Sequence, residues 1–224
     1  MRVFCVAALL AVSASVVPFA ASQAEPVGQV TMVKVWAYGT PPTEARRDLY
    51  KPDSVDQDEV VETVTSGALH MEFLDQSVLR LGSASTVKLD EFVYNPATTD
   101  GQMAVNLSKG VFRFVTGKMT KSGISFTTPS ATIGVRGTDF IATVDAAGNT
   151  TISVLEGAVD VTPAAGGPGI SVAAGQSVTV AMGASSGQIG QAFRNPDVGL
   201  DDAGSTPGND GGENDLGSSS SSEE

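Results

Sequence analysis

The feature that most constrains this chain is a two-residue alternation of apolar and polar side chains between Val30 and Gly183. Short runs rich in Val, Ile, Thr and Phe follow one another, and most end near a Gly, Asn or Pro. Such alternation points one face of a β-strand at a core and the other at solvent. No window shows a sustained helical period. The sequence therefore predicts an all-β domain of about a dozen short strands.

The arrangement of these strands is suggested by a recurring unit. LSKGVFRFVTG (107–117) and VLEGAVDVTP (154–163) both read as an apolar residue, a turn, a glycine and a strand. Recurrence of this kind favours a solenoid-like β-roll, in which each strand stacks on the next. A jelly-roll or Greek-key sandwich is the alternative.

Composition divides the chain into three parts. Residues 1–24 have one early charge, an apolar run and small residues before Glu25, which predicts a cleaved signal peptide and a periplasmic or secreted protein. Residues 25–190 are the predicted domain. Residues 195–224 contain eight acidic and no basic residues and too few apolar ones to form a core, so we expect a disordered tail. After signal cleavage we expect no membrane span.

The inventory of reactive side chains is poor. The one cysteine, Cys5, lies in the signal segment, so the mature protein has no thiol nucleophile and no disulfide. Alternation within ALHMEFL places the one histidine, His70, on the solvent face, away from Leu69 and Met71. We expect no catalytic residue, no cofactor and no metal site. The net charge is −12, and the sequence has no run of Lys and Arg that could form the basic surface needed to bind nucleic acid.

Two acidic segments are weak candidates for calcium. Residues 41–59 read as a polar surface loop with one helical turn near residues 44–50, and they include Asp53, Asp56, Asp58 and Glu59 without EF-hand spacing. GNDGGENDLG, residues 208–217, is one copy at most of a glycine–aspartate repeat that normally stacks in several copies. A solvated acidic linker is the preferred interpretation of this segment.

TPSATIGVRGTDF, residues 128–140, is the most distinctive local pattern. β-Branched residues follow Arg136 and no helix opens there, so the segment does not fit a phosphate-binding loop. It predicts a strand, a glycine-permitted bend and a second strand. Thr138 and Asp139 are expected to bond backbone amides in the turn. Arg136 is expected to bridge carbonyls or to pair with a carboxylate. The proposed structural residues are Pro129, Gly134, Arg136, Gly137, Thr138, Phe140, Gly157 and Gly175.

Taken in order, five segments closely resemble the FecR protein domain: FLDQSVLRLGSASTVKLDEFVYNP, LSKGVFRFVTG, ISFTTPSATIGVRGTDFIATV, ISVLEGAVDV and VAAGQSVTV. The resemblance runs from Asp58 to Val180. One departure is Gln76 in LDQS, where glycine would be more familiar. The resemblance implies a periplasmic, β-solenoid-like domain.

The family takes its name from a transmembrane regulator of iron–citrate uptake with a cytoplasmic anti-sigma region. We expect neither that region nor an internal span here, so the sigma-regulator function is not carried over. The resemblance favours a non-enzymatic interaction or sensing module, in envelope signalling, that binds an envelope protein of unknown identity. The alternatives are a structural or cell-surface β-protein, calcium-dependent in one version, and a hydrolase built from dispersed carboxylates.

Overall fold

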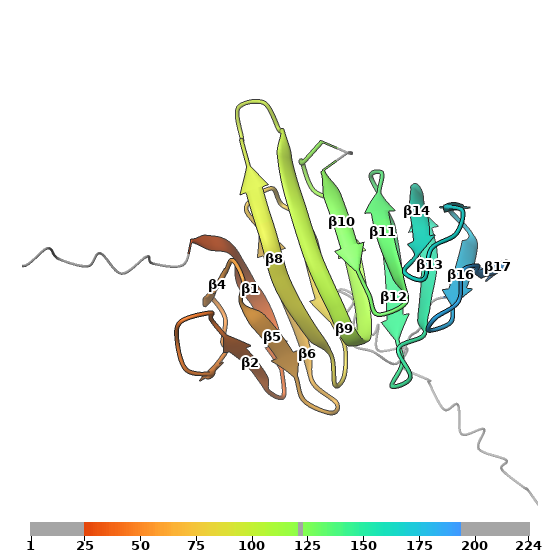
Figure 1. Cartoon of the computed structure of the whole chain (residues 1–224). Coiled ribbons are helices and arrows are strands. Elements are labelled where there is room, and N and C mark those ends of the chain that lie inside the picture. The colour runs from red at the N-terminus through yellow and green to blue at the C-terminus, as the bar shows by residue number, and fades with distance from the viewer. Residues whose placement is uncertain (1–24, 121–122, 194–224) are drawn as a thin grey trace, which may run out of the picture.

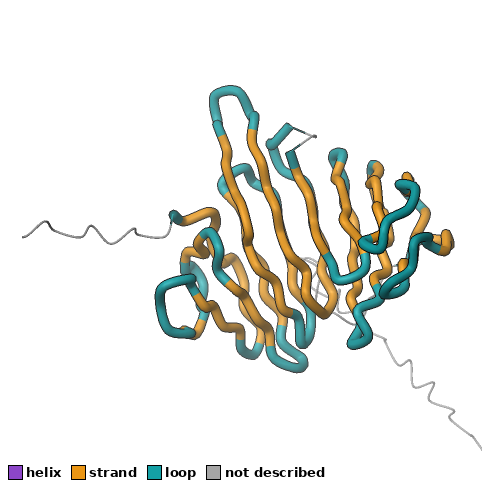
Figure 2. The backbone as a smooth tube through the Cα atoms, in the orientation of Figure 1, coloured by secondary structure: helices purple, strands orange, loops and turns teal. Residues whose placement is uncertain are grey.

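The computed structural model describes residues 25–120 and 123–193. Within these ranges the chain forms 17 strands and no helix (Figure 2), which confirms the all-β prediction. The expected signal peptide and the acidic tail lie outside the described residues, and both stay predictions.

The strands lie in two sheets that share one long strand, β9 (Figure 1), so all of them belong to one hydrogen-bonded network that does not close on itself. Sheet A runs in the order β4 (Ser54–Asp56), β1 (Pro26–Lys34), β6 (Ala68–Phe73), β7 (Val78–Leu81), β9 (Gly101–Val115), β12 (Asp139–Val144), β13 (Thr150–Glu156), β16 (Gln176–Val180) and β17 (Gln188–Gln191). Sheet B runs in the order β3 (Arg47–Asp48), β2 (Ala37–Thr40), β5 (Val60–Thr63), β8 (Thr86–Tyr94), β9, β10 (Ile124–Thr127), β11 (Ala131–Val135), β14 (Ala158–Pro163) and β15 (Ile170–Ala173).

Strand β9 passes from one sheet to the other at Gly110. Its first part pairs with β8 in sheet B as far as Lys109, and its last part pairs with β7 and β12 in sheet A. Gly110 has a φ of +111°, and a Cβ atom there would lie 2.2 Å from Oγ of Ser85. Only glycine fits this crossing without moving its neighbour.

The hydrophobic core lies between the two sheets. Phe126 of sheet B contacts Phe114 and Phe140 of sheet A, with ring centroids 4.7 and 5.3 Å apart. Phe73 of sheet A stacks on Phe92 of sheet B at 5.5 Å. These rings are buried, and the edge-to-face geometry of the first cluster is favourable for aromatic pairs. Phe140, singled out from the sequence, is therefore a core residue.

Successive hairpins alternate between the sheets. The hairpins β10–β11 and β14–β15 lie in sheet B, and β12–β13 and β16–β17 lie in sheet A. Neighbouring strands pair antiparallel, with β9 and β10 as the parallel exception.

The expected number of strands, about a dozen, is too low, since the structure has 17. The run from residue 30 to 38 is split into β1 and β2, because Val35 takes a φ of +67° and interrupts the extended backbone. The segment 41–59 adds β3 and β4, and β17 follows the last expected strand. The two runs between residues 102 and 115 are, conversely, one continuous strand, β9.

Candidate functional site

One end of sheet A carries a cleft where segments of the FecR-like pattern meet. The register sets Val115 of β9 beside Val78 of β7 and Asp139 of β12, and it sets Asp139 beside Glu156 of β13. The ends of these strands are therefore level, and the turns beyond them form a cleft of about 220 Å³. This signature cleft is lined by Val115, Thr116, Gly117, Met119, Gly137, Thr138, Asp139 and Glu156.

Two glycines let the turns beside the cleft pack closely. Gly137 and Gly157 have φ values of +67° and +75°, and a Cβ atom at position 157 would lie 2.2 Å from the carbonyl oxygen of Gly137. Gly134, which we expected at the same bend, instead continues β11 opposite Ser125 and Asp160, without a positive φ. That expectation is corrected: the chain bends after β11 has ended at Val135.

Asp139 joins two segments of the pattern. Its carboxylate accepts hydrogen bonds from Nε and Nη2 of Arg113 on β9, at 3.0 and 2.8 Å. Both side chains are largely shielded from solvent, with 13% and 17% exposed. Two parallel bonds of this kind fix orientation as well as distance. The expected role of Asp139, bonding turn amides, is therefore wrong, because a neighbouring strand presents a guanidinium at the same level.

Thr138 is held through its backbone. Its N–H donates to Oγ1 of Thr116 at 3.0 Å, and its carbonyl accepts from the N–H of Thr116 at 3.0 Å. Its own Oγ1 is buried and has no hydrogen-bond partner among the described residues. The expected side-chain bond to a turn amide is thus replaced by an unpartnered hydroxyl in a residue that lines the cleft.

Arg136 lies beside the cleft and is not part of its lining. Its Nη2 lies 2.7 Å from Oδ2 of Asp160 on β14, and the two side chains are 69% and 40% exposed. This is one of the two arrangements expected from the sequence. An exposed pair contributes about 0–1 kcal/mol to stability, so the guanidinium is available for contacts with a partner.

The turn between β6 and β7 is hydrogen-bonded to the chain segment 117–118 at the cleft. Buried Asp75 accepts hydrogen bonds from N and Oγ of Ser77, at 3.0 and 2.6 Å. Oγ of Ser77 then accepts from the N–H of Gly117, at 2.8 Å, and the carbonyl of Asp75 accepts from the N–H of Lys118, at 2.7 Å. Between them Gln76 has a φ of +67°. Its left-handed backbone explains why glycine would be the more familiar residue here.

The other residues singled out from the sequence lie away from the cleft lining. Pro129 is in the turn between β10 and β11, between the buried side chains of Thr128 and Ser130. Gly175, with a φ of +82°, forms the turn between β15 and β16, and its N–H donates to the carbonyl of Val154 at 3.0 Å. Thus Gly137, Thr138 and Gly157 come together, while Pro129 does not join them.

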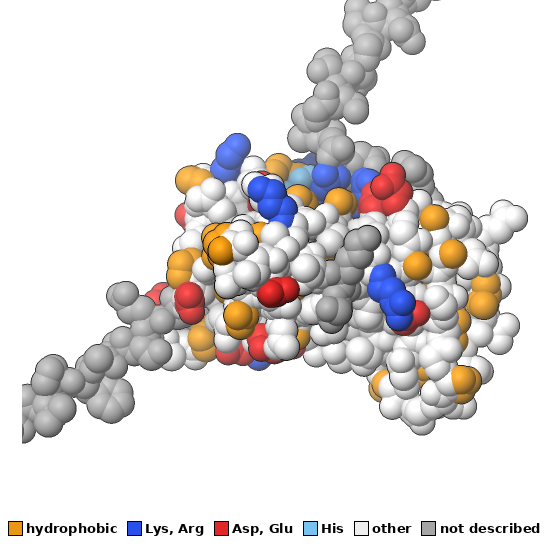
Figure 3. Space-filling view, turned by 90° about the horizontal axis from the view of Figure 1, so that it is seen from above, with side chains coloured by type: hydrophobic (Ala, Val, Ile, Leu, Met, Phe, Trp, Pro, Cys, Tyr) orange, Lys and Arg blue, Asp and Glu red, His pale blue; other side chains and the backbone are white. Residues whose placement is uncertain are grey.

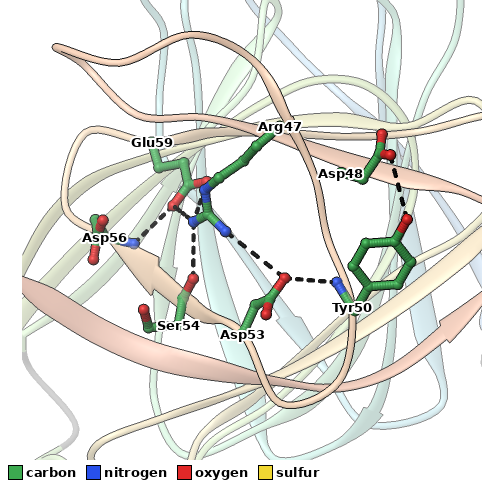
Figure 4. Close-up of polar contacts among 7 residues, drawn as sticks. All are labelled: Arg47, Asp48, Tyr50, Asp53, Ser54, Asp56 and Glu59. Atoms are coloured by element: carbon green, nitrogen blue, oxygen red, sulfur yellow. Dashed lines mark hydrogen bonds and ion pairs between the residues drawn. The ribbon is translucent and has the colours of Figure 1, made fainter.

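A second polar cluster, which the sequence did not reveal, lies on segment 41–59 (Figure 4). Arg47 donates to both carboxylate oxygens of Glu59, at 2.9 and 3.2 Å, and to the carbonyl of Ser54 at 2.9 Å. The N–H of Asp56 also donates to Glu59, at 2.9 Å. Glu59 is fully buried. Burial raises the pKa of its carboxyl, against the lowering effect of the bonds from Asp56 and Arg47.

This cluster corrects the expectation of a surface loop with a helical turn. The segment carries β3 and β4, and it buries Leu49, Val55 and Glu59. Its apolar residues are too few and too widely spaced to produce a readable period. The one sequence signal for this cluster is the acidic run itself, which by its composition indicates only a weak calcium site.

The acids of that run face cations and backbone amides. Asp58 lies 2.7 Å from Nζ of Lys88, and Asp53 accepts from the N–H of Tyr50 at 2.8 Å. Within residues 25–120 and 123–193, no three Asp, Glu, His or Cys side chains are grouped to hold a metal ion. The other acidic segment, residues 208–217, lies outside the described residues.

The prediction for His70 is wrong. Its side chain is only 7% exposed. Strand β6 lies between two neighbours, so His70 stands opposite Met32 of β1 and Arg80 of β7. Long side chains on both sides of a central strand cover the outer face as well as the inner one, which alternation along a single strand cannot show.

Two comparisons with known proteins give matches. The model of the FecR protein family matches residues 59–160. Two crystal structures, at 1.65 and 2.50 Å resolution, of an anti-sigma factor candidate from Parabacteroides distasonis are similar, with TM-scores of 0.47 and 0.48 and identities of 15% and 14%. Each match covers 59% of this chain and 59% of the other. No curated protein gives a significant match.

The matched range contains every residue that lines the signature cleft. The part of the chain that the structure describes contains no helix suited to crossing a bilayer. The matched range lies within the span from Asp58 to Val180 over which the sequence resembles this family. Residues 59–160 of this chain are therefore a FecR domain.

Proposed function

We propose that this chain is a non-enzymatic interaction or sensing module of the cell envelope, which acts in signalling by binding another envelope protein. The observation that carries the proposal is the convergence of the FecR segments on the signature cleft. Sequence features spread from Asp75 to Gly157 are joined there by buried hydrogen bonds and a bidentate ion pair.

The side chains of the cleft favour recognition over catalysis. Asp139 is held by Arg113, and the remaining lining residues offer hydroxyls, backbone groups and the exposed carboxylate of Glu156. General acid–base or nucleophilic chemistry needs a poised pair of groups within hydrogen-bond reach. The lining of the cleft includes no histidine, cysteine or lysine. A volume of about 220 Å³ is also small for a metabolite and suits one or two side chains of a protein partner.

The location that we propose is the periplasm or the exterior. The N-terminal pattern of residues 1–24 supports it. Mass spectrometry of the protein recovered from an envelope fraction should show an N-terminus at Glu25. An intact Met1 on the mature protein would contradict this part of the proposal.

For the architecture, we propose the solenoid-like roll. It is supported by the order of the hairpins, because from β7 onwards each sheet gains its strands in chain order toward the C-terminal end. The antiparallel pairing makes the repeating element a hairpin instead of a single strand.

The binding function can be tested by photo-crosslinking in cells. A benzoylphenylalanine placed at exposed Glu156, on the rim of the cleft, should form a discrete adduct with one envelope protein. The same probe at exposed Lys109, beside the crossing of β9, is the control. Identical adducts from both positions, or none from Glu156, would contradict the proposal.

A further inference from the structure

The C-terminal end of the described domain carries no charge. From Val161 to Phe193 the sequence contains no Asp, Glu, Lys, Arg or His. This stretch includes strands β15, β16 and β17. At the far right edge of Figure 3, the end where β16 and β17 lie in Figure 1, no blue or red side chains are visible, although both occur nearer the middle.

Both sheets end there on a strand that is paired on one side. In the part of the chain that the structure describes, β17 pairs with β16 alone and β15 pairs with β14 alone. All the residues of β17 are exposed. A strand in this position presents a row of backbone N–H and C=O groups that can pair with another extended chain.

The opposite end of the molecule is protected against pairing with other chains. Its outer strands, β3 and β4, have only two and three residues. They carry charged side chains, Arg47, Asp48 and Asp56. Short, charged edge strands discourage pairing with other chains. The C-terminal edge has no such charged side chains.

The open edge is also firmly held and partly apolar. Beyond β17, the N–H of Ala192 donates to the carbonyl of Gly175 at 2.8 Å, and Phe193 exchanges two bonds of 2.9 Å with Oγ of Ser153. Ile189 is 60% exposed and Met182 57%. A strand fixed in advance loses little entropy when a partner strand adds to it, and the exposed apolar groups supply contacts.

We propose that β17 is a strand-addition site for an extended, basic segment of another protein. A second copy of this chain is disfavoured, because the chain has a formal net charge of −12. Edge-to-edge pairing would bring two chains of the same strongly negative charge together, whereas this charge attracts a basic segment. The inference extends the proposed function, since it names a second binding surface and the chemistry of its partner.

The test uses peptides and the full chain. The probe is a fluorescent copy of β16, QSVTVAM, with a lysine at each end, because β16 already pairs with β17 over Gln176–Thr179. Anisotropy should show saturable binding, weaker for the version with glutamate ends. Ile189→Lys should weaken binding by about tenfold or more by placing a charge at the edge. Val93→Lys, which also changes a side chain more than half exposed, should leave binding unchanged.

The results distinguish whether β17 binds a segment of another protein, a second copy of this chain, or neither. No saturable binding, or equal binding by Ile189→Lys, overturns the inference. A concentration-dependent dimer in sedimentation that is lost in Ile189→Lys would make a second copy the occupant and also overturns it. Circular dichroism and thermal unfolding of both variants confirm that they are folded. If the peptide fails but the Glu156 crosslink persists, only the strand-addition site is lost and the proposed function stands.

Discussion

Replacing Gln76 by glycine should stabilise this protein. Gln76 lies in the turn between β6 and β7 with a φ of +67°, and its side chain is exposed. A left-handed backbone costs an L-residue about 1–2 kcal/mol. Glycine removes this strain, but it also raises the conformational entropy of the unfolded state, which lowers stability by about 0.4–1 kcal/mol. With the middle of each range, about 1.5 and about 0.7 kcal/mol, the free energy of unfolding should rise by about 0.8 kcal/mol.

The gain is measurable in two ways. For a domain of this size it corresponds to an increase in Tm of about 2–3 °C. Urea unfolding should move the midpoint to higher concentration at constant slope, because the surface exposed on unfolding hardly changes. The bonds from Ser77 to Asp75 are unaffected by the exchange.

The matched control is Gln29→Gly. Gln29 is also exposed, but it lies in β1 between β4 and β6 and has no positive φ. Glycine there should destabilise by about 0.5–1 kcal/mol. If Gln76→Gly were as destabilising as this control, the strain attributed to the turn would be refuted.

Three further outcomes are expected. Gly157→Ala should lower the free energy of unfolding in urea by at least about 1 kcal/mol more than Gly175→Ala. Both positions have a positive φ, but only a Cβ atom at position 157 would lie 2.2 Å from a carbonyl oxygen. Equal losses for the two variants would contradict the close packing at Gly157. Arg136→Ala should change the stability measured by thermal unfolding by only about 0–1 kcal/mol, because its ion pair with Asp160 is exposed. The same variant should weaken the crosslink formed from position 156. A larger destabilisation would assign Arg136 a mainly structural role. The raised pKa of buried Glu59 means that the folded state binds its proton more tightly than the unfolded state. Its contribution to stability is fully present below the ordinary pKa and is lost as pH rises through the raised one. Glu59→Gln should flatten that decline in urea titrations from pH 4 upward, and an unchanged slope would contradict the assignment.

The sequence was informative where one local rule decides the structure. Alternation alone predicts strands, because the side chains of a strand point to opposite faces whatever its partners are. Glycine at position 157 and the unusual Gln76 were also readable, since each depends on the local backbone and on the order of the FecR segments.

The pairing of side chains from distant strands was decided only by the tertiary structure. Asp139 meets Arg113 because β9 and β12 are neighbours in register, which no spacing along the chain reveals. His70 is buried where its neighbours across the sheet are Met32 of β1 and Arg80 of β7. Glu59 and Arg47 meet because segment 41–59 folds back onto the sheets.

The sequence by itself determined the all-β class, the FecR segments and the absence of charge from Val161 to Phe193. It could not show that this uncharged stretch ends on an open sheet edge, or that the FecR segments surround one cleft. Both depend on which strands become neighbours. Hydrogen bonds between strands and packing between sheets fix that choice over long distances in the chain, and local side-chain preferences do not encode it.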